Sequence, residues 1–259
     1  MLNRLAATLV IIILVIMGYY LYDRFRERSV AERLAEVIHE EDCRTLSSKL
    51  TGYLEDNAPE VRARAALAIG RIGGKDSGPL LYEKTQDDVI DVAAAAGFAI
   101  GLTGQKEYAA KLLNVAFDLP SAVGAMAVAS AGRLADSSMT EAADLLVGYL
   151  DHPSPDVREA ACLALFNAGA KSKKAELIGA VSDESDEIVR AAGLYALARL
   201  QVAKAASLFI ENLADPDPFV RSTCLRGLAR SDSPQAIHYL TIALNDGDPN
   251  VAARAVSEL

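Results

Sequence analysis

One valine-centred segment recurs seven times along this 259-residue chain, and it constrains the fold more than any other feature. The recurring valines are Val61, Val92, Val123, Val157, Val189, Val220 and Val251. They are separated by 31, 31, 34, 32, 31 and 31 residues, and their neighbours recur too, as in "SPDVREAACLALFNAG" and "DPFVRSTCLRGLAR". A repeat of this length predicts a stack of similar units, each burying its apolar face against the next.

Each repeat contains two helical patterns. In the first unit, Ala65, Ala66, Ile69 and Ile72 follow Val61 at the spacing of one buried helix face. A second, shorter apolar segment then follows, such as "TEAADLLVGYL" or "PQAIHYLTIAL". Several valine helices are expected to end at a glycine with left-handed backbone, at Gly73, Gly104 and Gly169. The chain is therefore predicted to be all-α, an α-α superhelix.

The repeated pattern has proline two residues before valine, arginine after it, and then A-A-x-A-L-x-x-I-G. It resembles the HEAT repeat, in the short PBS lyase HEAT-like variety. The units at Val61, Val157, Val189 and Val220 match best, whereas those at Val92 and Val123 lack both the proline and the arginine. The resemblance implies a HEAT-like solenoid acting mainly as a binding scaffold. It does not imply bilin chemistry, because no chromophore-handling site maps onto this chain.

The N-terminus is a separate piece. Residues 5–22 are almost entirely apolar, and eighteen residues of helix span about 27 Å, close to the thickness of a bilayer core. We therefore predict one transmembrane helix before the solenoid; a cleaved signal peptide or a buried helix is the alternative. The predicted domains are an anchor with a basic flank (1–28), a degenerate capping unit (29–54) and HEAT-like repeats (55–259), of which the last is incomplete.

Charge around this segment predicts its orientation. Arg24, Arg26, Arg28 and Arg33 follow the apolar run, and only Arg4 precedes it. The positive-inside rule places the repeats in the cytoplasm. The rule is weak for so short a tail, so a periplasmic location stays open.

Composition excludes several classes of function. The net charge of −9 argues against nucleic acid as a partner. The three cysteines and three histidines are scattered, which predicts neither a disulfide framework nor a metal site. The cysteines are interpreted as small buried hydrophobes. No nucleophile–base pair or phosphate-binding loop is recognisable, so no cofactor and no catalytic residue are predicted.

Acids and arginines flank the repeated valines at fixed positions. The acids stand five residues before the valine: Asp56, Asp87, Asp118, Glu184, Asp215 and Asp246, with His152 in the remaining unit. The arginines follow it directly: Arg62, Arg158, Arg190 and Arg221. An acid near a helix start accepts free N–H groups, whereas an arginine there opposes the helix dipole. We therefore expect each arginine to pair with an acid in the same or the adjacent turn, forming a structural ladder.

The valine helix also has positions that its core face does not use. In the HEAT family this helix lines the concave side, which implies a groove with a partly apolar floor, an arginine row along one edge and acids along part of the other. The candidate protein-binding residues are Leu67, Phe98, Leu163, Tyr195, Phe219, Arg226, Arg71, Arg133, Arg199 and Arg230. The alternative is structural: late-helix arginines complement the helix dipole, and neighbouring turns pack the floor.

Three functions compete. The first is a membrane-anchored, non-catalytic scaffold that binds a protein or peptide. The second is the N-terminal HEAT region of a larger bacterial enzyme, such as a cyclophilin-type peptidyl-prolyl isomerase, because the chain ends inside the seventh valine helix. The third is a phycobilin lyase-like chromophore chaperone.

Overall fold

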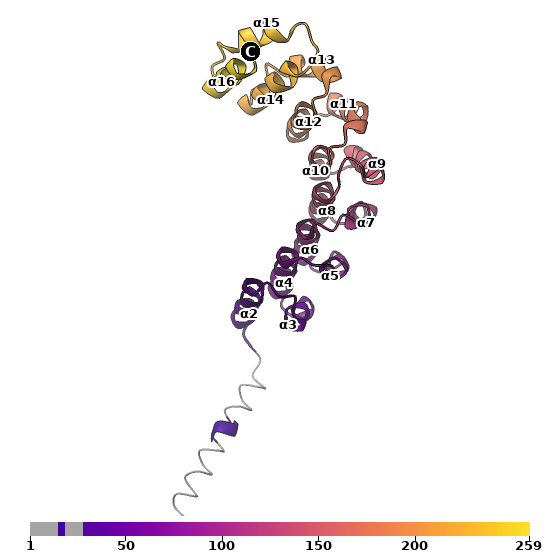
Figure 1. Cartoon of the computed structure of the whole chain (residues 1–259), viewed down its shortest axis with the longest axis vertical. Helices are drawn as coiled ribbons and strands as arrows, with labels where there is room; N and C mark the ends of the chain where they lie inside the picture. The colour runs from indigo at the N-terminus through magenta and orange to yellow at the C-terminus, as the bar shows by residue number, and fades with distance from the viewer. Residues whose placement is uncertain (1–14, 19–27) are drawn as a thin grey trace, which may run out of the picture.

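The computed structural model describes residues 15–18 and 28–259, which contain helices and no strand. The helices form two rows (Figure 1). The inner row is α2 (Val30–Asp42), α4 (Pro59–Ile72), α6 (Ile90–Thr103), α8 (Ser121–Leu134), α10 (Pro155–Asn167), α12 (Glu187–Arg199), α14 (Pro218–Ala229) and α16 (Pro249–Glu258). The outer row is α3 (Ser48–Gly52), α5 (Ser77–Lys84), α7 (Tyr108–Ala116), α9 (Thr140–Gly148), α11 (Lys174–Ser182), α13 (Ala206–Glu211) and α15 (Ala236–Ala243). Short 3₁₀ turns occur at Tyr53–Glu55, Tyr149–Asp151, Lys171–Lys173 and Ala203–Ala205.

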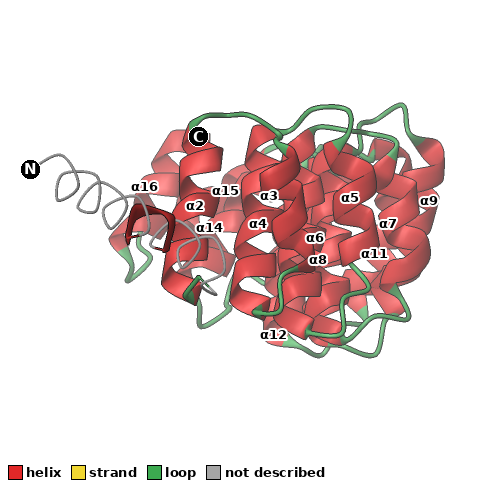
Figure 2. Cartoon of the chain, turned by 90° about the horizontal axis from the view of Figure 1, so that it is seen from below, coloured by secondary structure: helices red, strands yellow, loops and turns green. Residues whose placement is uncertain are grey.

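The two rows curve into a crescent. The inner row, which carries all the repeated valines, lies on the concave side, and the outer row lies on the convex side (Figure 1). The connecting loops lie at the two rims of the crescent (Figure 2). Because each repeat has the same up-and-down path, all the valine helices begin at one rim and end at the other. The predicted α-α superhelix is therefore confirmed.

The starts of the valine helices follow the predicted acid pattern. Proline occupies the first turn of four of these helices, where its missing N–H costs no helical hydrogen bond. The acid five residues before the valine accepts the N–H two residues after itself. In α14, Asp215 accepts the N–H of Asp217 at 2.8 Å, and Asp217 accepts that of Phe219 at 2.9 Å. These contacts fix the turn between one repeat and the next.

The arginine ladder is also present, and it runs between adjacent repeats. Arg62 meets Asp87 through two N–H···O contacts of 2.9 and 2.8 Å, and Arg158 meets Glu184 at 2.8 and 3.1 Å. Arg62, Arg158 and Arg221 each donate to a backbone carbonyl in the loop before their own helix, as Arg62 does to Asp56 at 2.9 Å. Arg190 pairs more loosely, 3.8 Å from Asp215. One side chain therefore ties its own loop to the next.

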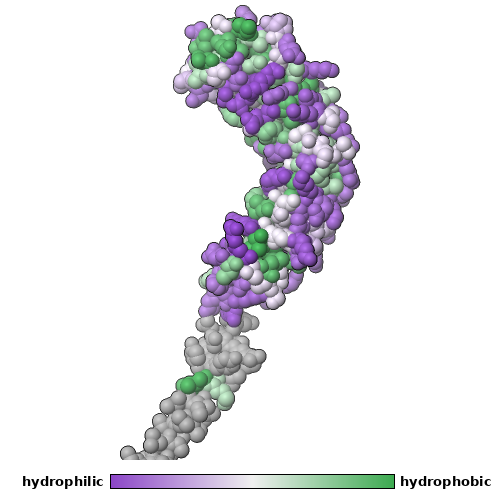
Figure 3. Space-filling view, in the orientation of Figure 1, coloured by the Kyte–Doolittle hydropathy of each residue, from purple (hydrophilic) through white to green (hydrophobic). Residues whose placement is uncertain are grey.

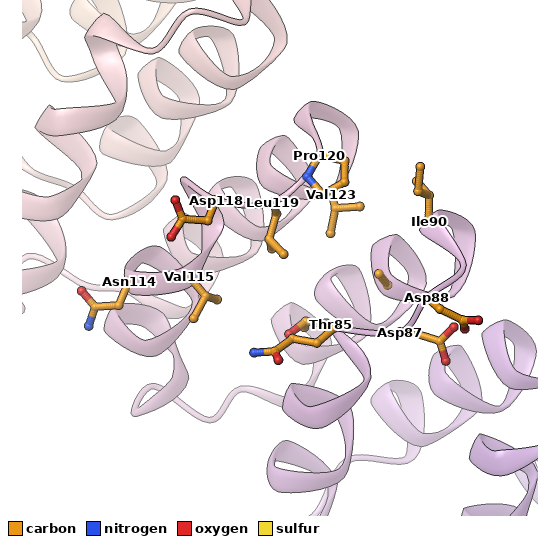
Figure 4. A pocket seen from close by; sticks show the side chains of 12 residues that line it. Thr85, Asp87, Asp88, Ile90, Asn114, Val115, Asp118, Leu119, Pro120 and Val123 are labelled. Atoms are coloured by element: carbon orange, nitrogen blue, oxygen red, sulfur yellow. The ribbon is translucent and has the colours of Figure 1, made fainter.

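The ladder is interrupted in the middle of the crescent. Ala93 and Gly124 occupy the two arginine positions, and a cavity of about 450 Å³ opens beside Ala93 (Figure 4). The side chain of Asp118, the acid of the next repeat, forms no hydrogen bond or ion pair with the described residues. Its usual backbone donor is missing as well, because Pro120 stands two residues later. The cavity occupies the place that an arginine fills in other repeats.

Small residues bring the inner helices close together. An added Cβ at Gly132 of α8 would lie 2.4 Å from Cα of Ala164 in α10, and one at Gly70 of α4 would lie 2.6 Å from the carbonyl oxygen of Ala99 in α6. Only glycine permits such an approach. Nine residues after the repeated valine, the first three units therefore carry glycine.

The core is continuous from α2 to α14, with a smaller cluster between α14, α15 and α16. Gly73, Gly104 and Gly169 end their helices with positive φ angles, as predicted. Two of the cysteines, Cys162 and Cys224, are buried as expected. Cys43 is exposed instead, because it follows α2 at the start of a loop, away from any helix face.

The predicted membrane anchor requires correction. Within residues 15–18 and 28–259, no helix has the length and apolarity needed to cross a bilayer. Of the predicted span, residues 5–22, only 15–18 belong to the described residues, and the rest of it lies outside them. The predicted membrane location is contradicted by this finding. The orientation inferred from the flanking arginines depended on that location, so it is withdrawn too.

Candidate protein-binding surface

The concave surface carries three columns of side chains from the inner row. They stand one residue before the repeated valine, six after it and ten after it. The column at six contains the half-buried residues Leu67, Phe98, Leu163, Tyr195 and Arg226, and the column at ten contains the exposed residues Arg71, Arg133, Arg199 and Arg230. The first and last columns are eleven residues apart along each helix, or about 16 Å. Hydrophilic and hydrophobic residues alternate along the inner edge of the crescent (Figure 3).

At the N-terminal end, the arginine column is neutralised. Arg71 donates to Glu41 of α2 at 2.9 Å, and Arg64 contacts the other oxygen of that carboxylate. Burial alone would raise the pKa of Glu41, but hydrogen bonds from Arg71 and Arg64 lower it overall. Leu67 lies on the same helix, half-buried. This end of the surface is therefore an internal ion-pair network.

In the middle of the crescent, Arg133 covers Phe98. The guanidinium carbon lies 5.0 Å from the ring centroid, within the range of a cation–π contact. Arg133 also donates to Ser130 at 2.7 Å, and it has no ion-pair partner among the described residues. The two sequence-predicted residues therefore lie together, with Phe98 shielded by the arginine.

Towards the C-terminal end, three aromatic rings cross the inner row. Phe166 of α10 meets Tyr195 of α12 edge-on at 5.6 Å, and Tyr195 stacks on Phe219 of α14 at 6.1 Å. Arg199 lies 5.3 Å from the centroid of Phe166 and 5.9 Å from that of Tyr195. Such ring pairs stabilise by ~1 kcal/mol beyond the area they bury.

Beside this aromatic row lies a hollow of about 310 Å³, termed here the apolar hollow. Its lining residues are Glu159, Leu163, Ile188, Ala191, Ala192, Tyr195 and Phe219. Ile188 is 67% exposed and Phe219 is 56% exposed, so two large apolar side chains face solvent at its edge. Glu159 alone is acidic, and burial, followed by repulsion from Asp156 and Asp186, raises its pKa.

The last arginines of the surface gather at one rim. Arg226 of α14, Arg230 directly after that helix and Arg254 of α16 lie 3.9, 3.8 and 3.4 Å from the carboxylate of Glu258. Arg199 of α12 completes the group, and it forms no ion pair with the described residues. These four residues are termed the arginine cluster. Burial, and then repulsion from Arg254, Arg199 and Arg230, lowers the pKa of Arg226.

The repeats match a known family. A model for HEAT repeats matches residues 79–166, 109–198 and 175–259, which together cover more than half of the chain. The chain belongs to the HEAT-repeat family. A model for the PBS lyase HEAT-like repeat matches residues 61–87, in agreement with the resemblance of that unit. A comparison with curated proteins found no match.

Solved structures of similar shape include human deoxyhypusine hydroxylase in complex with glycerol, at 19% identity and a TM-score of 0.41, covering 90% of this chain and 90% of that chain. They also include the CpcE–CpcF complex of phycocyanin lyase from Nostoc sp. PCC7120, at 20% identity and a TM-score of 0.46, covering 84% and 90%. An engineered protein has 22% identity and a TM-score of 0.47, covering 81% and 94%. At these TM-scores the likenesses indicate neither an activity nor a partner.

Sequence reasoning missed three contributors to this HEAT-repeat surface: Phe166, Arg254 and Glu258. A signal existed for Phe166, because the first three units carry glycine at its position, nine residues after the valine. An aromatic ring at a position where other repeats carry glycine indicates that the helices there do not need the close approach of glycine, and that the side chain lies at the surface instead. No comparable signal marked Glu258, whose role depends on the folding of α16 beside α14.

In the described part of this HEAT-repeat chain, neither the acidic and histidine side chains nor the two buried cysteines suggest metal or thiol chemistry. No group of three or more His, Cys, Asp or Glu residues there is arranged to hold a metal ion. Burial raises the pKa of the Cys162 and Cys224 thiols to about 12, so both are poor nucleophiles at neutral pH. The surface offers rings, apolar side chains and guanidinium groups, which are groups that bind.

Proposed function

We propose that this HEAT-repeat chain is a binding scaffold that holds a protein or peptide partner on its concave surface, without catalysing a reaction. The observation that carries the proposal is the row formed by Phe166, Tyr195 and Phe219, with Arg199 against two of its rings. Aromatic residues and arginines are the side chains that most often dominate protein interfaces. Here they lie half-buried or exposed on one continuous face rather than in the core.

The shape of the surface supports the same function. A curved row of parallel helices presents an extended face, which suits a long partner segment better than a small molecule. The apolar hollow is open and shallow enough to leave Ile188 and Phe219 mostly exposed. Covering these two side chains would remove apolar area from water, which favours association.

The test compares the partners captured by three forms of the full chain in its own cells. The concave variant carries Phe98→Ala, Tyr195→Ala and Arg199→Ala. The matched control carries Lys111→Ala, Ile237→Ala and Ile242→Ala, three exposed residues of the outer row. We expect the concave variant alone to lose specific partners, with both variants keeping wild-type helicity. Equal partner sets for all three forms would refute the proposal.

A further inference from the structure

The arginine cluster carries charge that the chain itself does not balance. Three of its four guanidinium groups share Glu258, and the closest of their contacts to it is 3.4 Å, whereas Arg199 has no ion-pair partner among the described residues. A well-formed charge-assisted hydrogen bond is about 2.7–2.9 Å. Three of the four ladder arginines reach that range, as Arg221 does with Asp246 at 2.7 Å, whereas Arg190 lies 3.8 Å from Asp215. The cluster therefore retains donors for an external acceptor.

The cluster differs from the other arginines of the concave surface. At the opposite end of the crescent, Arg64 and Arg71 both form ion pairs with Glu41. In the middle, Arg133 stands alone over Phe98. Within the described part of the concave surface, only the α12–α16 end brings four arginines together, in a chain whose net charge is −9. A local positive site on an acidic protein selects for a compact negative group rather than for a long polyanion.

The apolar hollow adjoins the cluster through Tyr195. Its ring lines the hollow and stacks on Phe219, and the guanidinium carbon of Arg199 lies 5.9 Å from its centroid. Tyr195 and Arg199 are one turn apart on α12, which places the first arginine about 6 Å along the helix from the hollow. An extended peptide advances ~3.3 Å per residue, so a carboxylate one to three residues from an apolar anchor would reach the cluster.

We propose that the concave face of α10–α16 binds an acidic segment of a partner protein, which places an apolar side chain in the hollow and carboxylates on Arg199, Arg226 and Arg230. This inference rests on the proposed function and specifies the chemistry of the partner. Arginine recognises carboxylates through paired N–H donors, and an apolar anchor in a pocket supplies most of the affinity.

The opposite edge of the hollow orients the segment. Glu159 lines the hollow, and Asp156 lies near it at the rim where α10 begins. Acidic residues on that side of the anchor would be repelled. The segment therefore carries its acids on one side of the anchor only. The same acidic rim, with the overall charge of −9, disfavours the phosphate backbone of a nucleic acid.

The experiment measures binding of fluorescent peptides to the full chain by anisotropy. The probe has the core Phe-Asp-Glu-Glu between Gly-Ser flanks. Its controls replace the acids by Asn and Gln, the anchor by Ala, or the acids by Lys, and a labelled single-stranded oligonucleotide tests the nucleic-acid alternative. We expect the acidic probe to bind at least about tenfold more tightly than each control, which corresponds to the loss of one strong contact. Its affinity should fall as salt is added.

Variants of the chain then locate the binding. We expect Arg230→Gln and Phe219→Ser each to weaken the acidic probe about tenfold. Lys111→Gln, an exposed cation of the outer row, and Ile237→Ser, in the same row, should leave its affinity unchanged. Preference for the neutral peptide or the oligonucleotide, insensitivity to both site variants, or no binding to any peptide would overturn the inference.

This outcome is separable from the proposed function. If the peptides fail while the concave variant with Phe98, Tyr195 and Arg199 replaced still loses its cellular partners, the scaffold function stands and the acidic-segment inference is wrong. If that variant keeps every partner, the scaffold function fails as well.

Discussion

The guanidinium of Arg221 meets the carboxylate of Asp246, from the next repeat, through two N–H···O contacts of 2.9 and 2.7 Å. The same guanidinium donates to the backbone carbonyls of Asp215 and Pro216 at 2.9 and 3.1 Å. Asp246 in turn accepts the N–H of Asp248 at 2.8 Å. A single mostly buried pair therefore links two consecutive inter-repeat loops, and its strength can be tested directly.

Replacing Arg221 with Ala should destabilise the fold by about 1–3 kcal/mol, because it removes hydrogen bonds to a mostly buried carboxylate and to two carbonyls. Thermal unfolding followed by circular dichroism would show a lower Tm. Lys204→Ala, at an exposed position in the preceding repeat, is the control and should have little effect. An unchanged Tm for Arg221→Ala would refute the structural role of the ladder.

The contribution of this pair should depend on pH. The hydrogen bond from Arg221, then that from the Asp248 N–H, lowers the pKa of Asp246 below its ordinary value of 3.8. A carboxyl with a lower pKa in the folded state stabilises the fold above its unfolded-state pKa, and this stabilisation is lost as the pH falls through the folded-state pKa. The stability gap between wild type and Arg221→Ala should thus be full near pH 7 and shrink below about pH 4. Denaturant titrations across this range would measure it; a constant gap contradicts the prediction.

The interrupted part of the ladder predicts a stabilising substitution. Ala93→Arg would place a guanidinium in the cavity beside Asp118, in the position from which Arg62 reaches Asp87 (Figure 4). We expect a gain of about 1 kcal/mol, seen as a higher Tm. Adding Asp118→Asn should remove most of that gain. Gly124→Arg is the matched control and should destabilise, because even a Cβ there would lie 2.8 Å from the carbonyl oxygen of Ala116.

The close approach of α8 and α10 can be tested at its glycine. Gly132→Ala should cost about 1–3 kcal/mol, because the new methyl would lie 2.4 Å from the backbone of Ala164 and the helices must separate. Gly148→Ala, near the end of α9, meets no atom within 4 Å and should be neutral or stabilising by up to ~1 kcal/mol. Urea denaturation measures both. Equal effects of the two substitutions would show that packing at Gly132 is not limiting.

The repeat made much of this structure predictable. Seven aligned valines indicate two helices per unit, and the acid and arginine columns predict the ladder, because each contact recurs between residues at fixed offsets. The interruption at Asp118 could be predicted only in part. The sequence shows that Ala93 replaces the ladder arginine. The missing N–H at Pro120 matters only because the structure shows that the acid of each repeat accepts the N–H two residues later, as Asp87 does from Val89. Features that depart from the repeat were not predicted, because they depend on contacts that do not recur at fixed offsets. Glu258 and Phe166 act through neighbours on other helices.

The three cysteines should differ in their reactivity towards thiol reagents in the folded protein. The interpretation of all three as buried hydrophobes is wrong for Cys43, which is exposed, with its Sγ 3.8 Å from Nε2 of His39. Cys162 and Cys224 are buried, so a reagent cannot reach them. Burial also raises the pKa of each thiol to about 12, so the reactive thiolate form is scarce at neutral pH. A thiol reagent such as an aromatic disulfide should modify one cysteine rapidly in the folded protein and the other two only on unfolding. Cys43→Ser should abolish the fast phase, whereas Cys224→Ser should preserve it. Rapid labelling that persists in Cys43→Ser would show that the α10 or α14 core opens readily.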